Sequence, residues 1–142
     1  IVLTIFLSII SLSYAQESKQ QVSLNLSFIA PNEGQELPVA KPFRCKGNYT
    51  PVDINTSTIH VWLFLMDEFL DGYYIQGPVL LLRNGTWDGR ITPGECIVKL
   101  VAIQANDEAH KAFTSWLKNK TFGKQYELPK GTEIIATIDI RS

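Results

Sequence analysis

The sequence predicts a mainly β protein, an antiparallel two-layer β-sandwich with one helix inserted before its last strand. Three observations predict this fold class. Short apolar runs of strand length recur along the chain and are separated by turn-forming residues. Helical periodicity occurs once, over residues 107–118. The regular alternation of strands and helices that a doubly wound α/β fold requires is absent from the sequence.

The composition is that of one ordinary globular domain. The chain has 142 residues and a net charge of −1, with 45% hydrophobic and 19% charged residues, which is enough apolar material for a substantial core. Lys and Arg residues are scattered along the chain, so the basic surface that nucleic-acid binding requires is not expected.

The N-terminal segment has the pattern of a secretory signal. It is an apolar run that ends in small residues, and Ser13 and Ala15 have the spacing that a signal peptidase accepts. Gln16 is the expected mature start, and the signal itself is expected to be truncated at its N-terminus. The run is shorter than the roughly 20 residues that cross a bilayer, so no membrane span is expected in the mature chain. A retained anchor or pilin-like helix is the alternative. The expected organisation is a signal, a linker and a β domain over 1–15, 16–21 and 22–142.

The strands are predicted from period-two alternation and from apolar runs that stop at turn residues. Two runs, 59–66 and 96–104, are apolar enough to be central strands. The Asn84-Gly85 pair predicts a hairpin that leads into Trp87. Residues 67–77 are expected to form a loop. The full set of expected strand segments is 22–28, 39–46, 59–66, 78–83, 96–104 and 132–140.

The helix over 107–118 is predicted from its cap and its apolar spacing. Asn106 can cap the N-terminus, and Asp107 and Glu108 favour the positive end of the helix dipole. Trp116 falls on the apolar face, as a packing residue.

Asn-X-Ser/Thr sequons are unusually dense and support export. They include five of the seven Asn residues, an excess that favours N-glycosylation over chance clustering in turns. The expected glycosylation sites are Asn25, Asn48, Asn55, Asn84 and Asn119.

The two cysteines, Cys45 and Cys96, each stand in an apolar run and are far apart in the sequence. In an exported protein, one disulfide between them is the economical expectation, and it would pin the two sheets together. Two buried free thiols are the alternative.

Several short motifs together resemble immunoglobulin-like β-sandwich modules of bacterial and archaeal exported or membrane-linked proteins. The resemblance extends over nearly all of the mature chain, and it implies an immunoglobulin-like sandwich. Such modules generally lack an assigned activity, so the resemblance implies no ligand. The motifs that carry it are 29–34, 45–47, 59–62, 73–76, 85–87, 98–104, the helix with Ala109 and Trp116, and 128–131.

The sequence predicts no catalytic residue, no metal site and no cofactor. The two histidines, His60 and His110, stand in no motif of a metal site or catalytic triad. Asp67, Glu68 and Asp71 cluster in one loop, but their spacing does not match an EF-hand, and a solvated acidic loop is expected.

Aromatic residues next to loops give the binding hypothesis. Tyr73, Tyr74 and Trp87 could form a stacking surface for sugars, although core packing is the alternative for Trp87. The sequence therefore favours a secreted or cell-surface binding or adhesion module, whose partner is carbohydrate or another surface protein. A structural subunit of a surface layer or filament is the alternative, and a small hydrolase is the less favoured third class.

Overall fold

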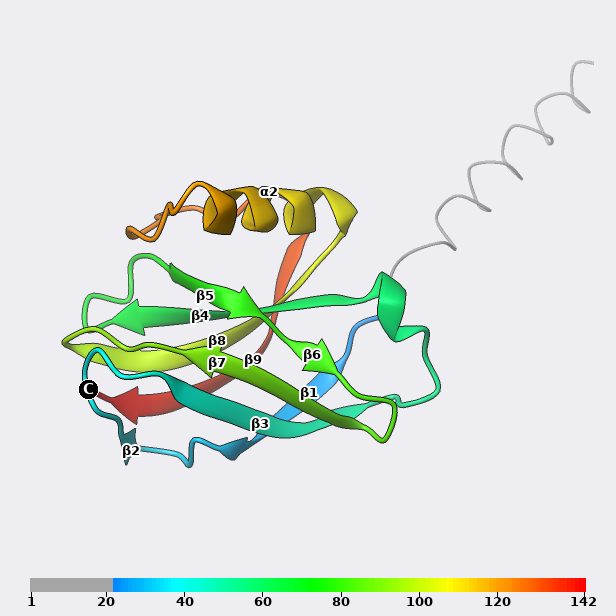
Figure 1. The fold of residues 1–142 in the computed structure, drawn as a ribbon, viewed down its shortest axis with the longest axis horizontal. Coiled ribbons are helices and arrows are strands. Elements are labelled where there is room, and N and C mark those ends of the chain that lie inside the picture. The colour runs from blue at the N-terminus through cyan, green and yellow to red at the C-terminus, as the bar shows by residue number, and fades with distance from the viewer. Residues whose placement is uncertain (1–21) are drawn as a thin grey trace, which may run out of the picture.

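The computed structural model describes residues 22–142, so the expected signal over 1–15 and linker over 16–21 lie outside the described residues. The described chain is mainly β, with two sheets and one long helix, α2 (Asp107–Lys118), which lies against the outside of one sheet (Figure 1). No helix among these residues is long and apolar enough to cross a membrane.

The first sheet has four strands in the order β1-β3-β7-β6, all antiparallel. Its strands are β1 (Asn25–Ala30), β3 (Phe43–Thr50), β7 (Thr86–Ile91) and β6 (Leu80–Leu81). The predicted hairpin at Asn84-Gly85 is confirmed as the turn between β6 and β7, with Gly85 at a φ of +85° that favours glycine.

The second sheet has five strands in the order β2-β9-β8-β4-β5, and only the β2–β9 pair is parallel. Its strands are β2 (Gln35–Glu36), β9 (Thr132–Arg141), β8 (Ile97–Ala105), β4 (His60–Asp67) and β5 (Tyr74–Pro78). A short 3₁₀ helix, η1 (Thr56–Thr58), joins β3 to β4.

The strand β4 is buried on both faces, as its apolar sequence predicts. Alternate residues of β4 pack in two separate cores. Leu63 packs in the core between the two sheets, which also contains Trp87 and Leu100. Phe64 packs in a second core beneath α2. The sheet β2-β9-β8-β4-β5 is therefore the middle layer, with the other sheet on one face and the helix on the opposite face (Figure 1).

The helix begins and ends where the sequence predicts. The Asn106 side chain caps it by accepting a hydrogen bond from the Ala109 backbone N–H at 2.9 Å. Phe113 is fully buried beneath the helix, with ring centroids 5.5 Å from Trp62 and 5.0 Å from Phe64. Aromatic packing against β4 therefore holds the helix on the sheet.

Two histidines join the N-terminal half of the helix to the start of β4: His110 is on the helix and His60 is on the strand. The rings of His60 and His110 are stacked, with centroids 3.7 Å apart. The Trp62 indole N–H donates to His110 Nδ1 at 3.0 Å, and His60 Nε2 lies 3.1 Å from the Asp107 carboxylate. Because an indole only donates, His110 Nδ1 must carry a lone pair, so this ring is neutral. Burial, with a smaller contribution from His60, lowers the pKa of His110 below its ordinary value of 6.5.

Acidification is therefore expected to weaken the docking of the helix. The His110 pKa is lower in the folded than in the unfolded chain, so this contribution to stability is complete above about pH 6.5. It is lost as the pH falls from there through the depressed pKa. Urea unfolding at pH 7.5, 6.5 and 5.5 should show a falling free energy of unfolding. The variant His110→Asn, which can still accept from Trp62 but does not titrate, should be flatter over this range. A parallel fall in both proteins would contradict the role of His110.

The segment 67–77, expected to be a loop, contains the edge strand β5. Its residues pair with β4 from Leu65↔Tyr74 to Trp62↔Pro78. An edge strand needs hydrogen bonds on one side only, so it tolerates Gly77 and Pro78. The apolar run 78–83, in contrast, forms only the two-residue strand β6.

The predicted disulfide between Cys45 and Cys96 is wrong, because both are free cysteines. Cys45 lies on β3 with no exposed surface, in the core between the sheets. Cys96 is exposed in the turn before β8, which begins one residue later than its apolar sequence suggests. Burial raises the pKa of the Cys45 thiol to about 12, which keeps this thiol protonated and unreactive.

Candidate functional site

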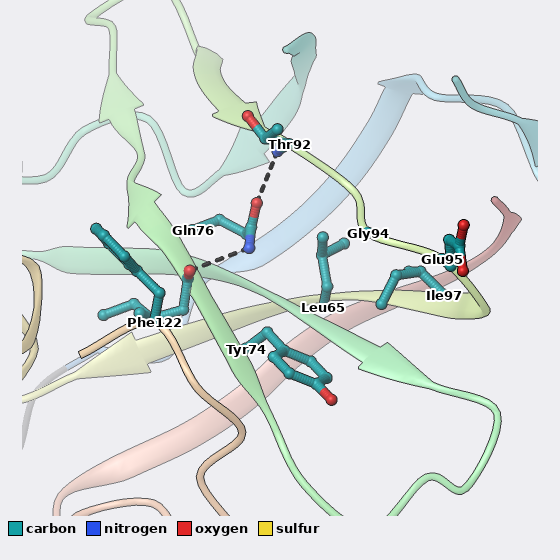
Figure 2. Close-up of a pocket in the computed structure, with 9 residues that line it drawn as sticks. Leu65, Tyr74, Gln76, Thr92, Gly94, Glu95, Ile97 and Phe122 are labelled. Carbon is teal, nitrogen blue, oxygen red and sulfur yellow. Dashed lines mark hydrogen bonds between the residues drawn. The ribbon is translucent and has the colours of Figure 1, made fainter. Parts of the chain in front are cut away.

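An open pocket of about 530 Å³ lies where β5 passes the segment that joins β7 to β8. Figure 2 shows its lining side chains, with Leu65, Tyr74 and Ile97 forming an apolar part and Gln76, Thr92 and Glu95 a polar part. Phe122, from the chain after α2, completes the lining and is 53% exposed. The volume suits one or two small-molecule rings, and the mixture of apolar and polar groups is typical of ligand pockets.

The Tyr74 ring is held in place from behind the pocket. Its hydroxyl donates to Asp67 Oδ2 at 3.0 Å, and Lys124 Nζ lies 2.6 Å from the same oxygen. Burial, followed by the hydrogen bond to Asp67, raises the pKa of Tyr74, so the hydroxyl remains a donor at neutral pH. The pocket therefore has an aromatic wall whose orientation is set before any ligand arrives.

Lys124 joins two loops that are distant in the sequence. Its Nζ contacts Asp67 at 2.6 Å and Asp71 at 2.7 Å. It also lies 5.3 to 5.9 Å from the ring centroids of Phe69, Tyr74 and Tyr126, which is within range of cation–π attraction. The lysine hydrogen bond lowers the pKa of Asp67, and the two carboxylates raise the pKa of Lys124.

The acidic loop, whose carboxylate spacing was compared above with that of a calcium-binding EF-hand, already has a cation, the Lys124 ammonium. The ammonium of Lys124 neutralises Asp67 and Asp71, the two carboxylates that come together. Glu68 is exposed and makes no ion pair within residues 22–142. Over that range, no group of three or more His, Cys, Asp or Glu side chains has an arrangement that could hold a metal ion.

The three aromatic residues predicted to bind a ligand do not come together. Tyr74 lines the pocket, but Tyr73, the residue before β5, packs its ring edge-on against Phe64 in the core beneath α2. Trp87 is only 1% exposed and its indole N–H donates to the Ser27 carbonyl at 3.0 Å. Trp87 is therefore a core residue, which confirms core packing, the alternative given above for this residue.

The five sequon asparagines are all exposed. Three sequons lie on neighbouring strands at one end of the four-stranded sheet. Asn25 pairs with Thr50, and Asn48 pairs with Thr86, which belongs to the Asn84 sequon. Asn55 and Asn84 stand in tight turns, where each side-chain oxygen accepts from the hydroxyl of its own sequon, at 2.6 and 2.5 Å.

The sequence predictions did not include Gln76, Glu95, Phe122 or Lys124 as site residues. For Phe122 and Lys124, the available signal was the segment 119–131, where two aromatic residues, Phe122 and Tyr126, stand among mostly polar residues between a helix and a strand. Such aromatic residues are candidates for exposure. Comparisons with protein families, curated proteins and solved structures give no match for this chain.

Proposed function

We propose that the chain is an exported cell-surface binding module with an immunoglobulin-like sandwich fold, and that its ligand is a carbohydrate. The observation that carries this proposal is the Tyr74 ring, fixed by Asp67 and Lys124 as a wall of an open pocket with polar groups on its rim. Sugars present apolar C–H faces and many hydroxyls, so a rigid aromatic ring beside amide and carboxylate groups suits them.

The strand order supports the immunoglobulin-like fold. The order β1-β3-β7-β6 corresponds to strands A-B-E-D, and β9-β8-β4 corresponds to G-F-C, with β5 added beside strand C. Trp62 lies on the strand equivalent to C, where immunoglobulin domains have a core tryptophan. Its side chain differs in direction, since it packs beneath α2 and not between the sheets.

Export is supported by the apolar N-terminal segment with its small-residue end and by the position of the sequons. All five sequon asparagines are exposed, and none lines the pocket. Asn25, Asn48 and Asn84 belong to the four-stranded sheet and its β6–β7 turn, whereas Tyr74 is on the edge of the other sheet. Glycans at those three sites would therefore leave the pocket accessible.

The test is a saccharide array probed with the exported protein and its variants. Tyr74→Ala should weaken binding roughly 30-fold, because truncating an aromatic anchor costs about 2 kcal/mol. Phe122→Ala should weaken binding in the same direction. Tyr126→Ala is the matched control, since Tyr126 is exposed but does not line the pocket. Circular dichroism should confirm that each variant is folded. Wild-type protein that retains no saccharide would refute the carbohydrate proposal, and unchanged binding by Tyr74→Ala would refute the site.

A further inference from the structure

A second pocket of about 650 Å³ adjoins the first along β5. Gln76 lines both pockets, and its side-chain oxygen accepts from the Thr92 backbone N–H at 2.7 Å (Figure 2). The segment 88–97 runs past both, contributing Arg90 to the second pocket and Glu95 to the first. The two pockets are therefore neighbours along β5, with the Gln76 side chain and its bond to Thr92 at their boundary, and together they are called the groove.

The second pocket has a positive charge that no ion pair within residues 22–142 neutralises. Arg44 and Arg90 face each other across the β3–β7 pair. The Arg44 guanidinium is paired with the Asp88 carboxylate through two bonds of 2.8 and 3.0 Å. Arg90 is exposed and makes no ion pair with any of residues 22–142. Asp88, which also lines this pocket, is a single carboxylate beside two guanidinium groups, so one positive charge in the pocket remains in excess.

We propose that the groove binds an anionic saccharide, with a sugar ring against Tyr74 and its carboxylate or sulfate group on Arg90. This inference rests on the proposed function and adds the charge class of the ligand. A guanidinium suits a planar carboxylate or a sulfate because its N–H groups can donate two parallel bonds. Glu95, the only charged residue that lines the first pocket, repels an anion there. The two pockets together therefore orient the ligand with its charged end toward Arg90.

The test compares saccharides that differ in charge alone. The probes are oligogalacturonate with its methyl ester, and a sulfated galactan with its desulfated, uncharged form, measured by calorimetry on the exported protein. At least one acidic form should bind tighter than its neutralised counterpart by about 10- to 100-fold, the range expected for a charge-assisted hydrogen bond. The pair that shows the difference identifies carboxylate or sulfate as the anion. Arg90→Gln should remove the difference. Arg83→Gln, an exposed arginine in the β6–β7 turn outside both pockets, is the control and should change nothing.

The outcomes separate this inference from the proposed function. Equal binding of charged and neutral forms by the wild-type protein, or an unchanged preference in Arg90→Gln, overturns the anionic class and leaves the carbohydrate proposal standing. No binding of any saccharide overturns both.

Discussion

Replacing Trp87 by alanine is expected to lower the free energy of unfolding by about 3–5 kcal/mol, the usual cost of truncating a large buried aromatic residue. The indole is 1% exposed, packs edge-on against Phe28 at 5.4 Å, and donates to the Ser27 carbonyl. It also lies against Gly47, where an added Cβ would come within 2.5 Å of the indole nitrogen, so glycine at this position makes room for the indole. The measurement is urea unfolding followed by circular dichroism.

The control for this prediction is Trp87→Phe. It keeps an aromatic ring in the core but removes the hydrogen bond to Ser27, so a smaller loss is expected, with the unfolding slope unchanged. A loss below about 1 kcal/mol in Trp87→Ala, which is typical of surface substitutions, would contradict the burial of this side chain and reopen its role as a ligand-binding residue.

Replacing Phe113 by alanine is expected to cost a similar 3–5 kcal/mol through the other core. Phe113 is fully buried and contacts the rings of Trp62, Phe64 and Trp116, which makes it the central contact between α2 and the sheet. Because a domain of this size is stable by only about 5–15 kcal/mol, the loss is a large fraction of the total.

The variant Phe113→Leu is the matched control, since it keeps an apolar side chain beneath the helix and should lose less. Hydrogen exchange locates the effect. In Phe113→Ala the amides of residues 107–118 should exchange faster than those of β3 and β7, because the two cores are separate. Uniform loss of protection across both sheets would show that the helix layer is not an independent part of the fold.

Local sequence patterns predicted the elements whose conformation depends on residues close together in the sequence. The helix over 107–118 has its cap, its acidic first turn and its apolar stripe within a few residues, so the sequence alone defined both ends. The Asn84-Gly85 turn is equally local, because its positive φ favours glycine. The strand β4 was predictable because it is apolar on both faces, which only a middle layer explains.

The structure differs from the sequence predictions where a residue's contacts come from distant parts of the chain. β5 became a strand because β4 offers it a free edge, and the Gly77-Pro78 pair at its end is unfavourable in a strand by itself. The cysteines show the same limit, since Cys96 directly precedes the buried strand β8, and a difference of one position in the start of that strand leaves its thiol exposed. Strand boundaries depend on pairing, which the sequence pattern locates only within a few residues.

The sequence by itself determined the fold class, the helix, the central strands and the surface character of the sequons, because these follow from local periodicity and from turn chemistry. Only the tertiary structure decided which aromatic side chains are accessible. Tyr73 and Tyr74 are adjacent in sequence, but Tyr73 packs against the core beneath α2 and only Tyr74 lines the pocket, as Phe122 does. The pairing of Lys124 with Asp67 and the opposition of Arg44 and Arg90 join residues more than forty positions apart. Such contacts depend on sheet order and register, which arise when the whole chain packs.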